Sequence, residues 1–172
     1  ERIRGLERLK PLRVPNLGIF TGSLGSNAST IISTLSSYAL VILSERGSYL
    51  PEVAAGLAEK HIPVYGQIDA QQPLAVVQTE IGEWAQVGAA GIYLKSFGDG
   101  VATTRNAEQA LLDSVQQVSL SVLLSGSNPA RWLENHADPA YNPDGLALTF
   151  PPKTLVQLRP FGYGSKIQTS GE

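Results

Sequence analysis

Cysteine and methionine are absent from this sequence of 172 residues, and only two histidines occur, His61 and His136. The absence of cysteine excludes a disulfide scaffold and thiolate metal sites, and two histidines are too few for a histidine-rich metal centre. We therefore expect the chain to hold no metal. Since it begins at Glu1 and contains no methionine, we also expect it to be a processed product or a piece of a longer protein.

Charged residues are also scarce, at 16% of the chain, and they nearly balance to a net charge of -2. This balance provides no overall attraction to polyanions, so nucleic acid is not expected as a partner. No apolar run approaches the roughly 18 residues that a membrane span needs. We expect a soluble protein, and the composition leaves open whether it is extracellular or part of a large assembly.

Apolar residues make up 42% of the chain, which is enough for one well-filled core. The two ends differ from the rest. Residues 1–13 form a basic arm, and residues 151–172 are rich in proline and glycine, which predicts an extended tail. We expect one domain over residues 14–150, with both ends contacting other protein subunits or domains.

Short apolar runs alternate with segments of helical spacing between these ends. The helical segments have plausible starts at Asn27, Ser48, Pro73, Thr104 and Asn128. Trp84 and Trp132 fall in them at positions that favour packing in the core. The six strand candidates are 17–20, 39–43, 62–65, 91–94, 121–124 and 146–150. This alternation predicts an α/β fold with a parallel sheet covered by helices, because parallel strands need crossovers of this length.

The spacing of the strand candidates allows two architectures. The runs recur about every 26 residues, so a complete barrel of eight units would need roughly 206 residues. The chain has room for about six. It is therefore either an open doubly wound sheet or a (β/α) barrel that is incomplete or completed by other material.

Ligands bind at the carboxyl ends of parallel strands in both architectures, so the residues after each run are the candidates for chemistry. Three carboxylates lie there, Glu45, Asp69 and Asp99, and a pair of them would suit a general acid and base. The glycine-rich loop 21–27 precedes a helix, but it matches neither nucleotide-binding glycine motif, so no cofactor is expected. Its use as a phosphate or small-molecule site is the least favoured alternative.

Several short motifs resemble the spherulin-four-like and endo-alpha-1,4-polygalactosaminidase-like group of TIM barrels. They are Val64-Tyr65-Gly66, Glu83-Trp84, the strand 91–94 and Ser127-Asn128-Pro129, within a match over residues 17–150. The resemblance implies a barrel with a glycan site at its carboxyl end. The candidate ligand-binding residues are Ser23, Asn27, Tyr65, Gln67, Lys95 and Asn128.

The sequence departs from this group at the residues that carry the chemistry. Lys95 stands where the fourth strand should end in an acid, and an ammonium group cannot replace a carboxyl in glycoside hydrolysis. Ser44 stands where an Asp is typical, with Glu45 beside it. We therefore favour a noncatalytic glycosidase-like barrel module, a structural or glycan-facing part of a larger protein or assembly. The alternative is an active glycoside hydrolase on an amino-sugar polysaccharide, using Asp69 with Asp99 or with Glu45.

Overall fold

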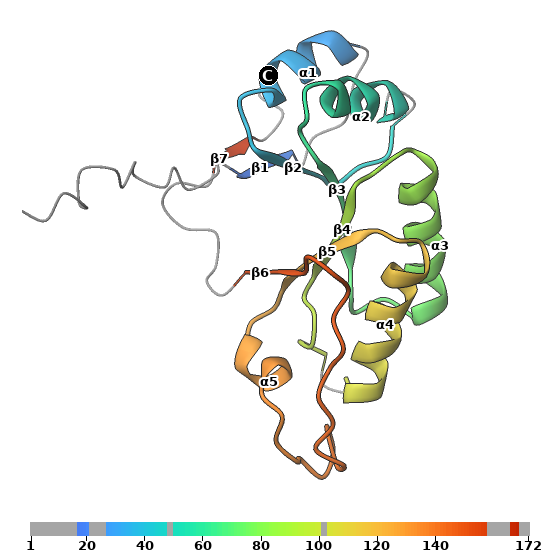
Figure 1. Cartoon of the computed structure of the whole chain (residues 1–172), viewed down its shortest axis with the longest axis vertical. Coiled ribbons are helices and arrows are strands. Elements are labelled where there is room, and N and C mark those ends of the chain that lie inside the picture. Colours follow the sequence, from blue (N-terminus) through green and yellow to red (C-terminus); the bar gives the residue numbers. More distant parts are fainter. Residues whose placement is uncertain (1–16, 21–26, 48–49, 101–102, 158–165, 169–172) are drawn as a thin grey trace, which may run out of the picture.

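The computed structural model describes residues 17–20, 27–47, 50–100, 103–157 and 166–168 (Figure 1). Seven strands form one sheet within these residues. They are β1 (Leu17–Phe20), β2 (Leu40–Leu43), β3 (Val64–Asp69), β4 (Gly91–Lys95), β5 (Ser121–Ser125), β6 (Leu155–Gln157) and β7 (Lys166–Gln168). All neighbouring strands are parallel, which confirms the predicted α/β fold with a parallel sheet.

The strands lie in the order β6-β5-β4-β3-β2-β1-β7. From β1 to β6, each new strand is added on the same side of the one before it, so the crossovers all run in one direction. Right-handed crossovers in one direction place their helices on a single face of the sheet. A doubly wound sheet reverses direction and carries helices on both faces. The open doubly wound alternative is therefore wrong, and the chain forms a partial (β/α) barrel.

Four helices cover one side of the sheet, and a short fifth helix lies near the lower end of the molecule in Figure 1. They are α1 (Ala28–Leu35), α2 (Leu50–Glu59), α3 (Leu74–Gln86), α4 (Arg105–Gln117) and α5 (Pro129–Leu133). The helix starts expected at Asn27, Pro73, Thr104 and Asn128 are confirmed, since each is the N-cap residue of its helix. Ser48 lies outside the described residues.

The core is divided between the two faces of the sheet, because successive side chains of a strand point to opposite faces. The larger cluster lies under the helices and includes Val41, Ile92 and Leu124. The smaller cluster lines the inner face of the partial barrel. It contains one residue from each of five neighbouring strands, namely Ile19, Ile42, Tyr65, Tyr93 and Leu123.

Both tryptophans pack in the core, as predicted. Trp84 and Trp132 are each 1% exposed. Trp84 of α3 lies against Gly66 of β3, where a Cβ atom would overlap its indole ring. Trp132 of α5 makes an edge-on contact with Phe97, with the ring centroids 5.2 Å apart. Both rings therefore fasten helices to the sheet and its loops rather than stack on a sugar.

The prediction of a sixth strand at residues 146–150 is wrong, because β6 lies at Leu155–Gln157. Side chains bind the backbone of the expected strand. Asn142 accepts a hydrogen bond from the Leu146 N–H (3.0 Å), and Gln109 of α4 accepts one from the Thr149 N–H (2.8 Å). Both amide side chains also donate to the carbonyl of the same residue. The segment is thus held beside α4, and β5 pairs with a later segment.

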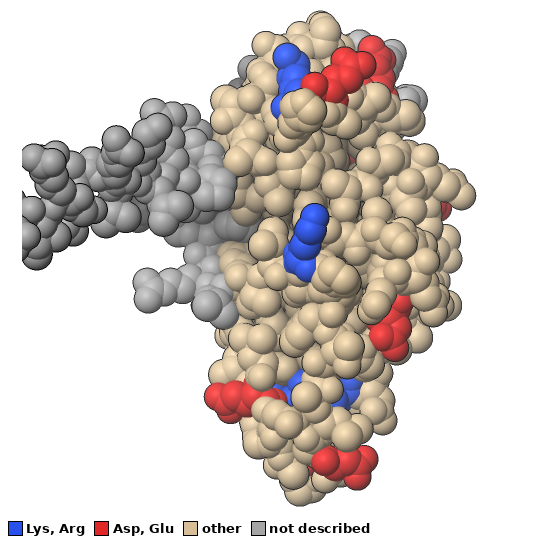
Figure 2. All heavy atoms as spheres, in the orientation of Figure 1, with Lys and Arg blue, Asp and Glu red and all other residues tan. Residues whose placement is uncertain are grey.

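Charge is thinly spread over the surface. Figure 2 shows few basic and acidic side chains on the face in view, some of them side by side near the top, with wide uncharged surface elsewhere. Among the residues that the structure describes, no helix is long and apolar enough to cross a membrane. No group of three or more histidine and acidic side chains in this part of the chain is placed to hold a metal ion.

Candidate ligand-binding rim

The carboxyl ends of β3, β4 and β5 carry polar side chains toward the inner face of the sheet. Gln67 of β3 pairs in register with Tyr93 of β4, and Asp69 pairs with Lys95. Gln67 and Asp69 lie two and four residues after Tyr65 on β3, and Lys95 lies two residues after Tyr93 on β4. Their side chains therefore point to the face of the sheet that carries Tyr65 and Tyr93 of the inner cluster. We name Gln67, Asp69, Tyr93, Lys95 and Ser125 the rim. Two of its members, Gln67 and Lys95, were expected to bind a ligand.

Tyr93 and Ser125 are joined by a hydrogen bond of 2.8 Å between their hydroxyl oxygens. The Tyr93 side chain is buried, and Ser125 is half-buried. Burial raises the pKa of the Tyr93 phenol, and the bond to Ser125 partly offsets this effect. The phenol therefore stays protonated at neutral pH and forms a fixed hydrogen-bonding group at the floor of the rim.

Asp69 and Lys95 are both exposed, and they occupy paired positions on neighbouring strands. One Asp69 oxygen, Oδ1, accepts a hydrogen bond of 2.9 Å from the Gln71 N–H, which closes a turn after β3. No ion pair within 4.0 Å joins Asp69 to Lys95, although both residues are described. Within the part of the chain that the structure describes, the Lys95 ammonium forms no ion pair.

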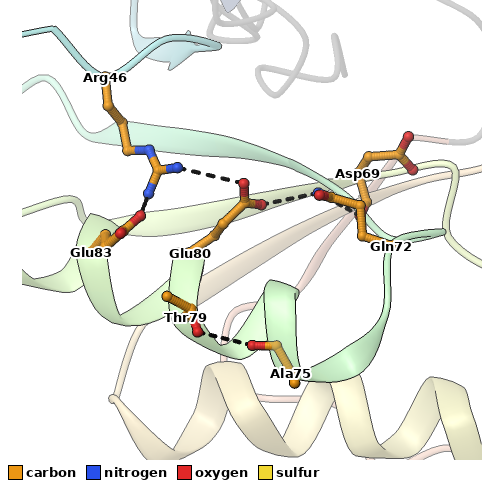
Figure 3. A network of polar contacts seen from close by, with 7 residues as sticks. All are labelled: Arg46, Asp69, Gln72, Ala75, Thr79, Glu80 and Glu83. Atoms are coloured by element: carbon orange, nitrogen blue, oxygen red, sulfur yellow. Dashed lines mark hydrogen bonds and ion pairs between the residues drawn. The ribbon is translucent and has the colours of Figure 1, made fainter.

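The loop after β2 is tied to α3 by an ion-pair network (Figure 3). Arg46 forms ion pairs with Glu83 and, at 3.5 Å, with Glu80. Gln72 donates to the other Glu80 oxygen at 3.0 Å. Figure 3 shows the Asp69 carboxylate turned away from this network. Arg46 is thus a structural residue that holds this loop against α3. Glu45, one of the three candidate catalytic carboxylates, is exposed.

Asp99 joins the loops that follow β4 and β5. Its Oδ1 atom accepts two hydrogen bonds of 2.7 Å, one from the Ser127 N–H and one from the Ser127 hydroxyl. These two bonds hold the loops together. The Oδ1 atom of Asp99 therefore has a structural role, because it joins the loop after β4 to the loop after β5.

The remaining expected site residues lie elsewhere. Asn27 caps α1, with its Oδ1 accepting from the Thr30 N–H at 3.1 Å. Tyr65 is 5% exposed and belongs to the inner cluster, below the rim. Asn128 is exposed at the start of α5. Ser23 lies outside the described residues. The structure therefore brings together only part of the expected set.

A buried polar cluster on the helix side was not expected from the sequence. Glu108 of α4 is 0% exposed and accepts a hydrogen bond of 2.6 Å from the Tyr141 hydroxyl. Arg105, 3% exposed, donates to the carbonyls of Trp132 and Glu134, at 2.6 Å each. The signal was present in the sequence, because positions 105 and 108 share the α4 face that also carries the buried Leu112 and Val115.

Burial raises the pKa of Glu108, and the hydrogen bond from Tyr141 and the charges of Arg105 and Arg131 only partly offset it. The native protein therefore holds this proton more tightly than the unfolded chain does. The free energy of unfolding consequently falls as the pH rises above the ordinary glutamate pKa of 4.5, up to the raised native pKa.

We expect Glu108→Gln to remove this fall, because glutamine does not ionise and still accepts from Tyr141. Urea unfolding of the wild type and the variant from about pH 4 to about pH 7 measures it. The variant gains stability relative to the wild type as the pH rises. Glu52→Gln, at an exposed position of α2, is the control. A difference between wild type and Glu108→Gln that does not change with pH contradicts the prediction.

Comparisons with known proteins do not assign the chain to a family. No protein-family model and no curated protein matches it. Among solved structures, a rubisco-like protein from Alicyclobacillus acidocaldarius is similar over 74% of this chain, with 13% identity and a TM-score of 0.43. A xylose isomerase domain protein from Planctomyces limnophilus is similar over 64%, with 14% identity and a TM-score of 0.40. The chain spans 35% and 52% of their lengths. The assignment of the fold rests on the strand order and pairing of this chain itself.

Proposed function

We propose that this chain is a noncatalytic, barrel-like module that binds a hydroxyl-rich ligand of the glycan class at the rim. The pairing of Asp69 with Lys95 carries the proposal. A glycoside hydrolase needs two carboxyl groups facing the scissile bond. Here the rim position beside Asp69 holds an ammonium group instead, and the oxygen of Asp99 is engaged by Ser127.

The other rim side chains support binding of hydroxyl groups. Gln67 of β3 and Ser125 of β5 supply donors and acceptors, the buried hydroxyl of Tyr93 holds Ser125 in position from β4, and Lys95 supplies three N–H donors. Rigid strands hold these groups in place, which lowers the entropy cost of binding. A hydroxyl-rich ligand can satisfy all of them without a change in covalent structure.

The proposal includes a place in a larger protein or assembly, with contacts through residues 1–13 and 151–172. The described part of the second segment supports it. β6 pairs with β5 and forms an edge of the sheet, and Leu155 on this strand is 45% exposed. Its register partner on β5, Leu123, is 7% exposed. An apolar side chain at an open edge favours contact with another chain or domain.

Retention in affinity gels that contain soluble chitin oligosaccharides or galactan tests the glycan site. We expect Lys95→Ala to weaken binding about tenfold, since a charged hydrogen-bond donor is lost. Lys60→Ala is the matched control. Lys60 is exposed like Lys95, but it lies between α2 and the amino end of β3, whereas the rim lies at the carboxyl ends of the strands. Equal retention of both variants, or no retention of the wild type on either glycan, contradicts the proposal.

Product release from the same glycans tests the noncatalytic part. The wild type is expected to release no product. Turnover that Asp69→Asn or Asp99→Asn abolishes would show an active glycoside hydrolase and name its acid.

A further inference from the structure

A cavity of about 450 Å³ lies outside the sheet, at the beginnings of α3 and α4. Its volume is within the range of roughly 300 to 1,000 Å³ that small-molecule sites occupy. Ala70 and Gln72 line it on the β3 side, and Gly100 and Thr103 line it on the α4 side. No residue of the rim lines it, although Asp69 of the rim directly precedes the lining residue Ala70 and accepts a hydrogen bond from the Gln71 N–H.

The body of this cavity is apolar. Leu74, Ala107 and Leu111 contribute to its wall. Leu74 is 40% exposed, whereas Leu111 is 7% exposed, so the apolar wall extends from the core to the surface. A ligand with an apolar body would remove the exposed part of Leu74 from water, which favours binding by about 25 cal/mol for each Å² buried.

None of the described residues that line the cavity has an ionisable side chain. Gln71, Gln72 and Thr103 are its polar side chains. Gln72 is held in position by its bond of 3.0 Å to Glu80. The amides and the hydroxyl suit a carbonyl or hydroxyl oxygen.

The surroundings disfavour a charged ligand of either sign. α3 and α4 both begin at this cavity, and no acidic residue lies in the first turn of α3. The acidic residue in the first turn of α4, Glu108, is buried against Tyr141 and does not line the cavity. The partial positive charge at two helix starts disfavours a cation. The Asp69 carboxylate, which accepts from the N–H of the lining residue Gln71, disfavours an anion.

We propose that this cavity binds an uncharged small molecule with an apolar body and a carbonyl or hydroxyl oxygen. The apolar body lies against Leu74, Ala107 and Leu111, and the oxygen bonds with Thr103 or the glutamine amides. The site does not depend on the proposed glycan site, because the two share no residue.

A matched series of probes tests the site, namely acetophenone, benzoate and benzylamine. They share an aromatic ring and differ in charge. Methyl chemical shifts of Leu74, Ala107 and Leu111 are followed during titration of the full chain. We expect acetophenone to shift these signals saturably and to bind at least about threefold more tightly than either charged probe. Unmoved signals, or equal binding of the three probes, would overturn the proposal.

Two substitutions separate the cavity from general surface binding. Ala107→Phe places a ring in the cavity and is expected to weaken acetophenone binding about tenfold. Ala130→Phe adds the same ring at an exposed position of α5 and is expected to leave binding unchanged. Thr103→Val keeps the shape but removes the hydroxyl, with an expected loss of about threefold. Wild-type affinity in Ala107→Phe would overturn the proposal.

Discussion

Replacing Gly66 by alanine is expected to destabilise the protein by about 3 kcal/mol, the upper part of the usual range for overpacking. Gly66 lies in the middle of β3, and an added Cβ would overlap the five- and six-membered rings of Trp84. The indole is 1% exposed and packed on all sides, so it has little room to move. Urea unfolding measures the change through the midpoint and its slope.

Gly82→Ala is the control for this substitution. Gly82 lies within α3, two residues before Trp84, and a Cβ there would meet nothing within 4 Å. The same chemical change is then expected to stabilise the protein by about 0.5 to 1 kcal/mol, because alanine favours the helix. A Gly66→Ala protein as stable as the wild type would show that α3 is not seated on β3 through this contact.

The second large effect is expected from Arg105→Leu, which should cost about 3 kcal/mol or more. The guanidinium donates to the carbonyls of Trp132 and Glu134, and at 3.4 Å to that of Arg131. These carbonyls lie at the end of α5, where no intrahelical donor reaches them. Leucine would leave buried acceptors without partners and would remove a positive charge near Glu108.

Two further variants define this role in urea unfolding experiments. Arg105→Lys is expected to recover little stability, because one ammonium group cannot reach carbonyls spread around a helix end as a planar guanidinium does. Arg46→Leu removes two surface ion pairs, with Glu80 and Glu83, and is expected to cost about 1 kcal/mol or less. Equal losses in Arg105→Leu and Arg46→Leu would contradict the buried role of Arg105.

These two contacts explain how the rim is held. Trp84 on Gly66 fixes α3 against β3, the strand that carries Gln67 and Asp69. Arg105 fixes α5 against the start of α4, and the bonds from Ser127 to Asp99 join the loops beyond β4 and β5. The polar side chains of the rim thus rest on a scaffold packed from the helix side. Rigid support of this kind is what positions binding groups for a ligand.

The helix starts at Asn27, Pro73, Thr104 and Asn128 and the approximate positions of the first five strands were predictable because their signals are local. Asn27 and Thr104 cap the helices that follow them through bonds to backbone N–H groups three residues away. A short apolar run marks each of β1 to β5, although the run at 62–65 overlaps only the first two residues of β3, which continues through Gln67 to Asp69. The sixth strand was not predictable in this way. The run at 146–150 has the right composition, but Asn142 and Gln109 bind its backbone, and the bond to Gln109 spans forty residues.

The candidate site likewise has features that the sequence predicts and features that only the tertiary structure shows. The sequence alone determined that polar residues lie at or after the ends of the strands and that a lysine, Lys95, ends β4. The choice among the three carboxylates needed tertiary structure, because strand register places Asp69 beside Lys95, and a contact between distant loops engages Asp99. The buried pair of Arg105 and Glu108 likewise depends on partners from 131–141. Local composition determines elements and their ends, whereas pairing between segments far apart in the chain decides which polar groups meet.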